Sequence, residues 1–103
     1  MKISWESSAK ASLRQVARYI NSKFGRKARK EFMQRVKTTE NQLKRSPGIG
    51  QIDPLFEDRP LAYRSVIIIG LNKLVYRVDD DTIHIVAFWD TRREPTDEAA
   101  QTE

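Results

Sequence analysis

The chain has no cysteine, a single histidine, and only four glycines and four prolines among its 103 residues. The missing thiols exclude a disulfide framework, an iron–sulfur or thiolate–zinc site, and a cysteine nucleophile. A lone histidine also argues against a zinc site built from protein side chains alone, because such sites need several suitable ligands. We therefore expect a protein that works without a metal or a cofactor.

Long apolar segments are also absent. The longest uninterrupted apolar run is Ile85 to Trp89, far short of the roughly 20 residues that a membrane-spanning helix needs. The first six residues, MKISWE, lack the apolar run of a signal peptide. We expect a cytoplasmic protein without membrane contact. Its length and 39% hydrophobic content fit one compact domain.

Acidic residues are scarce in the first half of the chain. Residues 1–50 carry a net charge of +10 and residues 51–103 a net charge of −5, within a total of +5. Such asymmetry indicates a surface that attracts a polyanion, either nucleic acid or an acidic protein segment. A solvated helical surface that is simply rich in Lys and Arg remains the alternative.

The first half has the periodicity of two helices. After a short strand at Ile3 to Trp5, the spacing of apolar residues predicts a helix over Ser7 to Phe24, with Ser7 or Ser8 as its N-cap and Gly25 ending it. A second helix is predicted over Arg26 to Arg45, and the Ser46-Pro47-Gly48 sequence stops it. The buried faces are expected to hold Leu13, Val16, Ala17, Ile20 and Phe24 in the first helix, and Ala28, Phe32, Val36, Thr39 and Leu43 in the second.

The second half has the composition of strands. After a connecting loop at 46–61, three strands rich in branched and aromatic residues are predicted at Ala62 to Ile69, Lys73 to Asp79 and Thr82 to Trp89. If Leu71-Asn72 and Asp80-Asp81 are two-residue turns, Gly70 faces Lys73 and Asp79 faces Thr82. The fold class is therefore α+β, with a short N-terminal strand, a helical hairpin and a three-stranded antiparallel meander.

This register divides the three strands into two faces. The face toward the helices collects Ile67, Ile69, Leu74, Tyr76, Val78, Ile83, Ile85, Ala87 and Trp89. The opposite face collects Arg64, Val66, Ile68, Lys73, Val75, Arg77, His84, Val86 and Phe88, with Arg77 directly across from His84. The cations of this face form a candidate anion site, although an exposed antiparallel face also needs polar residues for solubility.

The order of elements resembles the RelE/ParE toxin superfamily over roughly residues 3–95. The resemblance is carried by FGRKA (24–28), YRSVI (63–67), KLVYRV (73–78) and FWDTRREP (88–95). It implies one toxin domain over residues 1–95, and the acidic composition of residues 96–103 predicts a disordered tail. It also implies a growth-inhibitory toxin of a bacterial type II toxin–antitoxin module, held inactive by a cognate antitoxin that wraps around it.

Two activities occur in this superfamily. RelE-like members cleave mRNA on the ribosome without metal, whereas ParE-like members inhibit DNA gyrase and cleave nothing. The resemblance assigns the RelE-like basic positions to Arg64, Lys73 and Arg92. Together with Arg77, which the register places on the same face, and Arg93, they are the candidate anion- or target-binding residues. His84 is a candidate general acid or base, and its alternative role is that of a half-buried strand residue.

The sequence departs from the RelE-like pattern at two places. Val66 stands where a basic residue is expected, and no Tyr or His follows Pro95. The interpretation therefore favours a ParE-like inhibitor of gyrase, with a ribosome-dependent mRNA interferase or a non-toxic binding module as alternatives. Whether the protein is an enzyme stays open at this point.

Overall fold

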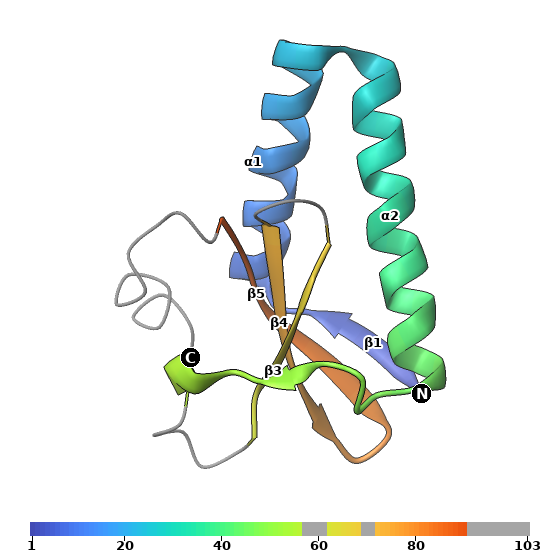
Figure 1. Ribbon diagram of the computed structural model, residues 1–103, viewed down its shortest axis with the longest axis vertical. Coiled ribbons are helices and arrows are strands. Elements are labelled where there is room, and N and C mark those ends of the chain that lie inside the picture. Colours follow the sequence, from blue (N-terminus) through green and yellow to red (C-terminus); the bar gives the residue numbers. More distant parts are fainter. Residues whose placement is uncertain (57–61, 69–71, 91–103) are drawn as a thin grey trace.

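The computed structural model describes residues 1–56, 62–68 and 72–90, and it places two helices against a five-stranded sheet (Figure 1). The sheet order is β1-β5-β4-β3-β2. β1 pairs in parallel with β5, and the other neighbours are antiparallel. The elements in chain order are β1 (Lys2–Trp5), α1 (Ser7–Phe24), α2 (Arg26–Arg45), β2 (Gln51–Ile52), the 3₁₀ turn η1 (Pro54–Phe56), β3 (Arg64–Ile67), β4 (Asn72–Asp79) and β5 (Thr82–Asp90).

Both helices lie at their predicted bounds, and Gly25 separates them. Gly25 has φ 98° and ψ 175°, a region that is open to glycine and closed to residues with a Cβ. Its N–H donates to the Asn21 carbonyl. The prediction of Ser7 or Ser8 as N-cap was wrong, because Glu6 occupies that position without a side-chain hydrogen bond.

The helical hairpin extends past the end of the sheet, as Figure 1 shows at its upper end. Phe24 lies close to this tip and is 69% exposed, so its predicted place on the buried face was wrong. The fully buried residues of the helices are Ala9, Leu13 and Ala17 in α1, and Phe32, Val36 and Leu43 in α2. All of these except Ala9 were predicted.

The main core lies between the helices and one face of the sheet. Leu74 and Tyr76 of β4 pack there with Ile83, Ile85 and Phe88 of β5. A smaller cluster lies on the other side of the sheet, which we call the outer face, where Val75, Val86 and Ala87 pack with Tyr63 and Leu55.

The β4–β5 hairpin has the predicted turn but contains an unpredicted bulge. Asp79 pairs with Thr82 and Arg77 pairs with His84, as expected from an Asp80-Asp81 turn. Asp80 has φ 55°, a conformation that Asp tolerates better than most residues. The register then shifts, because Tyr76 pairs with Ile85 while Val75 pairs with Ala87.

Val86 is thus an extra residue on β5, and every side chain beyond it changes face. Phe88 was predicted on the outer face but lies in the main core. Ala87 was predicted to face the helices but belongs to the outer cluster. Trp89 is buried as expected, yet it pairs with Lys73 of the outer face.

The predicted register of β3 with β4 was wrong. Arg64 pairs with Tyr76 and Ile67 pairs with Lys73, and the Ile68 N–H donates to the Asn72 carbonyl. The connection is therefore longer than the assumed Leu71-Asn72 turn, and the pairing is displaced by three residues. An odd displacement exchanges the two faces of a strand. Ile68 consequently joins the main core, whereas Ile67 is 56% exposed.

The segment after α2 contains two elements that the sequence did not reveal. β2 adds a fifth strand at the sheet edge through the pairs Gln51 with Ser65 and Ile52 with Arg64. η1 follows it at Pro54–Phe56 and brings Leu55 onto the outer face. Within the described ranges, no helix is long and apolar enough to cross a membrane.

Candidate functional site

The candidate site lies on the outer face, where β4 supplies two cations. Lys73, Val75 and Arg77 alternate along β4 and therefore share this face. His84 lies opposite Arg77 on β5. Both Arg77 and His84 are half-buried. The structure thus places three of the predicted site residues, Lys73, Arg77 and His84, on one face of the sheet, and it makes Arg77 and His84 direct neighbours.

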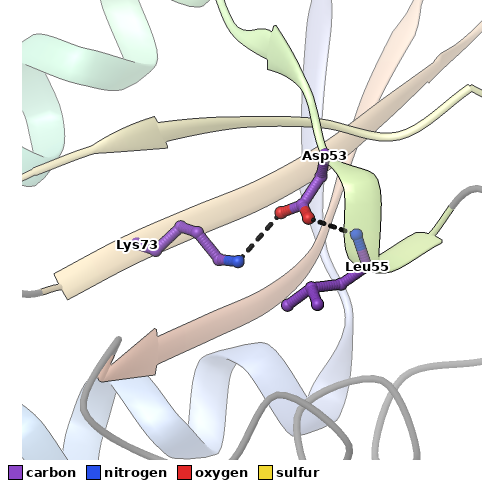
Figure 2. A network of polar contacts seen from close by, with 3 residues as sticks. All are labelled: Asp53, Leu55 and Lys73. Carbon is purple, nitrogen blue, oxygen red and sulfur yellow. Dashed lines mark hydrogen bonds and ion pairs between the residues drawn. The ribbon is translucent and has the colours of Figure 1, made fainter.

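Lys73 is held by a buried carboxylate that the sequence analysis did not single out. The Lys73 Nζ lies 2.9 Å from Asp53 Oδ2, and the two side chains are 12% and 2% exposed (Figure 2). The other carboxylate oxygen, Oδ1, accepts the Leu55 N–H at 3.0 Å. Asp53 therefore fixes the start of η1 and neutralises Lys73 at the same time, and this ion pair joins the 53–56 turn to β4.

Arg64 serves a different part of the structure, because it lies on the face toward the helices. It pairs with Tyr76 in the sheet, and its guanidinium donates to the Gly50 carbonyl at 2.8 Å and the Gly48 carbonyl at 3.4 Å. The Tyr76 hydroxyl donates to the Pro47 carbonyl at 2.6 Å and accepts the Gly50 N–H at 3.0 Å. These contacts hold the turn between α2 and β2.

Gly50 is packed so closely that only glycine fits. A Cβ at this position would lie 2.7 Å from the Tyr76 hydroxyl and 3.0 Å from the Ser65 carbonyl. Burial raises the pKa of the Tyr76 hydroxyl, although the Gly50 hydrogen bond and the nearby Arg64 charge lower it. The hydroxyl therefore stays protonated at neutral pH and keeps its bond to Pro47.

Removing this hydroxyl has a predictable cost. We expect Tyr76→Phe to lower the free energy of unfolding by about 1–3 kcal/mol, because it leaves the Gly50 N–H and the Pro47 carbonyl without their partner. Urea unfolding measures the change. Tyr19→Phe, at a tyrosine that is 57% exposed, is the matched control and should stay within about 0.5 kcal/mol of the parent. Equal stability of both variants would contradict the assigned role of Tyr76.

The predicted site therefore needs correction at Arg64. Arg64 and Lys73 lie on opposite faces of the sheet, so the four residues Arg64, Lys73, Arg77 and His84 do not form one anion site. The cause is the longer β3–β4 connection, which reverses the faces of β3. Arg92 and Arg93 lie outside the described residues.

Two residues of this region were not among the predicted site residues. The sequence places Asp53 in a connecting loop and Tyr76 in the core. An Asp followed by Pro does signal a turn in which the carboxylate accepts a nearby backbone N–H, which matches its bond to Leu55. No sequence signal connects Asp53 with Lys73, twenty positions away. In the described part of the chain, no group of three or more His, Asp or Glu residues could hold a metal ion.

The chain is an α+β domain in which a helical hairpin packs on one face of a largely antiparallel sheet. A family model for the ParE toxin of the type II toxin–antitoxin system parDE matches residues 3–95. The chain belongs to this toxin family, within the RelE/ParE superfamily that the sequence resembles.

Solved structures share the fold. A chain of the chromosomal ParDE toxin–antitoxin system from P. aeruginosa is 18% identical, with a TM-score of 0.70 over 87% of this chain and 95% of that one. A chain of the YoeB dimer from Staphylococcus aureus is 22% identical, with a TM-score of 0.58 over 84% of this chain and 92% of that one. No curated protein matches the chain.

Proposed function

We propose that this toxin inhibits growth by acting on DNA gyrase without hydrolysing nucleic acid, and that a cognate antitoxin neutralises it. The toxin family supports the general part of this proposal. The observation that carries the specific part is the Lys73–Asp53 ion pair, at 2.9 Å and almost fully buried. Metal-free RNA cleavage needs cations that are available to the phosphate as its charge develops, and Lys73 is already neutralised.

Arg64 supports the same conclusion. It is the second cation that a RelE-like mechanism would use, and its guanidinium is bound to backbone carbonyls of the turn after α2. Val66, in place of a further basic residue, packs against the main core. The described residues thus offer no group of cations at the positions where a RelE-like site would need them.

One observation favours the alternative, a ribosome-dependent mRNA interferase. Arg77 and His84 are cross-strand neighbours on the outer face, and a cation beside an imidazole is a pairing that general acid–base chemistry can use. This pair would have to act without Lys73. The two activities therefore make different predictions for the same purified protein.

Two assays separate them. We expect purified toxin to inhibit supercoiling by gyrase and to leave mRNA intact on ribosomes programmed with an A-site codon. Cleavage products at the A-site codon that disappear in His84→Ala or Arg92→Ala would overturn the gyrase proposal. Inhibition of supercoiling that survives both substitutions would support it.

The toxin role itself is tested in cells. Expression of this chain alone should arrest growth, and co-expression of the small open reading frame expected beside its gene should restore it. The antitoxin would supply acidic segments to a chain whose first fifty residues carry a net charge of +10. Unchanged growth at high expression of the folded protein would refute the role.

A further inference from the structure

The helical hairpin carries a dense and unbalanced positive charge. Helices α1 and α2 together hold twelve Lys and Arg residues but only two acidic ones, Glu31 and Glu40. All twelve cations are exposed: Lys10, Arg14, Arg18, Lys23, Arg26, Lys27, Arg29, Lys30, Arg35, Lys37, Lys44 and Arg45. The charge of the first half of the chain therefore lies on one structural unit.

The protein does not neutralise these cations internally. Among the described residues, no hairpin Lys or Arg makes an ion pair with a carboxylate. Glu40 accepts a hydrogen bond from the Trp5 indole N–H at 2.8 Å, so one of the two acids already has another partner. A fully solvated surface commonly alternates charges of both signs, and this one does not.

Four of the cations form a row along α2. Arg26, Lys30, Lys37 and Lys44 are separated by four, seven and seven residues, spacings that keep side chains on one side of a helix. At 1.5 Å per residue the row is about 27 Å long, which corresponds to about eight base-pair steps of duplex DNA. The row lies away from the buried stripe of Phe32, Val36 and Leu43.

We propose that this cationic row binds the phosphate backbone of a nucleic-acid duplex. Three of its four members are lysines, which are depleted at the centre of protein–protein interfaces but are common contacts to phosphate. The inference goes beyond the action on gyrase, because it requires no enzyme: the toxin itself would hold the nucleic acid. The chemistry recognised is the phosphodiester backbone, of either DNA or RNA.

The number of cations sets the expected salt dependence. Four phosphate contacts give a slope of about −3.6 for the logarithm of the binding constant against that of the salt concentration. Fluorescence anisotropy with a labelled 20-base-pair DNA duplex measures this slope, and an RNA duplex of the same sequence distinguishes the two sources. We expect dissociation constants of about 1–100 μM, typical of binding without sequence preference.

Matched variants test the position of the contact. Lys37→Gln and Gln51→Glu both lower the net charge by one, but Gln51 is exposed on the edge strand β2. We expect Lys37→Gln to weaken binding about eightfold at 0.1 M salt and to flatten the slope by about 0.9. Gln51→Glu should change binding by less than about twofold, since it leaves the four phosphate contacts intact. The double variant Lys30→Gln/Lys37→Gln should lose about 60-fold.

Several results would overturn the proposal. One is the absence of saturable binding of either duplex at 50 mM salt. The others are a salt dependence of the binding constant near zero, and equal losses of affinity in Lys37→Gln and Gln51→Glu. Tighter binding of polyglutamate than of the duplex, compared at an equal concentration of negative charges, would instead assign the row to an acidic protein. Thermal unfolding of each variant confirms that it is folded. The duplex-binding assay contains no gyrase, so a negative result in it does not contradict the proposed action on gyrase. A negative result in the gyrase assay likewise does not contradict binding of the duplex.

Discussion

Replacing Asp53 by asparagine should lower the free energy of unfolding by about 3 kcal/mol. The substitution keeps an oxygen that can accept the Leu55 N–H but removes the charge opposite Lys73, whose side chain is only 12% exposed. Removing one charge from a buried ion pair costs more free energy than the intact pair contributes. The urea midpoint, with an unchanged slope of unfolding free energy against urea, measures this loss.

A double substitution identifies the cause. In Asp53→Asn/Lys73→Met the cation is absent, so we expect the double variant to be more stable than Asp53→Asn alone. Asp53→Ala should be less stable than Asp53→Asn, because it also removes the acceptor of the Leu55 N–H. A loss below about 0.5 kcal/mol in Asp53→Asn would show that the ion pair does not hold the 53–56 turn to β4.

The second large effect is expected at Phe88. The residue is 1% exposed. Its ring packs edge-on against Phe32, with 5.9 Å between the ring centroids, and beside Trp5, with 6.4 Å between the centroids. Phe88→Ala should lower the free energy of unfolding by about 3–5 kcal/mol, because the substitution leaves a cavity between the helices and the sheet.

Ile67→Ala is the control, since that side chain is 56% exposed and should change stability by less than about 0.5 kcal/mol. The register expected from sequence, without a bulge, places Ile67 toward the helices and Phe88 on the outer face. It therefore predicts a larger loss of stability in Ile67→Ala than in Phe88→Ala. A larger loss in Ile67→Ala than in Phe88→Ala would therefore contradict both the Val86 bulge and the register of β3.

The observed contacts of Arg64 and Lys73 also affect how charge reversal at these two positions is interpreted. From sequence, Arg64 and Lys73 are surface cations whose reversal should leave stability unchanged. In the structure Arg64 holds the Gly50 carbonyl and Lys73 holds Asp53. Reversal at either position disrupts these contacts, so a loss of toxicity there would not separate binding from folding.

Local signals in the sequence determined the elements of this protein. Apolar residues three and four apart, together with a glycine that tolerates positive φ, were enough to place α1, Gly25 and α2 at their observed bounds. The Asp80-Asp81 turn likewise set the pairing of Arg77 with His84. The family resemblance, carried by motifs spread over residues 3–95, was confirmed by the family model.

Beyond the pairs next to the Asp80-Asp81 turn, the tertiary structure decided which side chains meet. The Val86 bulge and the longer β3–β4 connection each displace the strand pairing by an odd number of residues. An odd displacement moves side chains to the other face of the sheet, and the alternation of side chains in the sequence does not reveal it. The partners of Lys73 and Tyr76 come from the segment after α2. Such contacts depend on how a distant loop folds back over the sheet, and the pairwise preferences of neighbouring residues contain no information about that path.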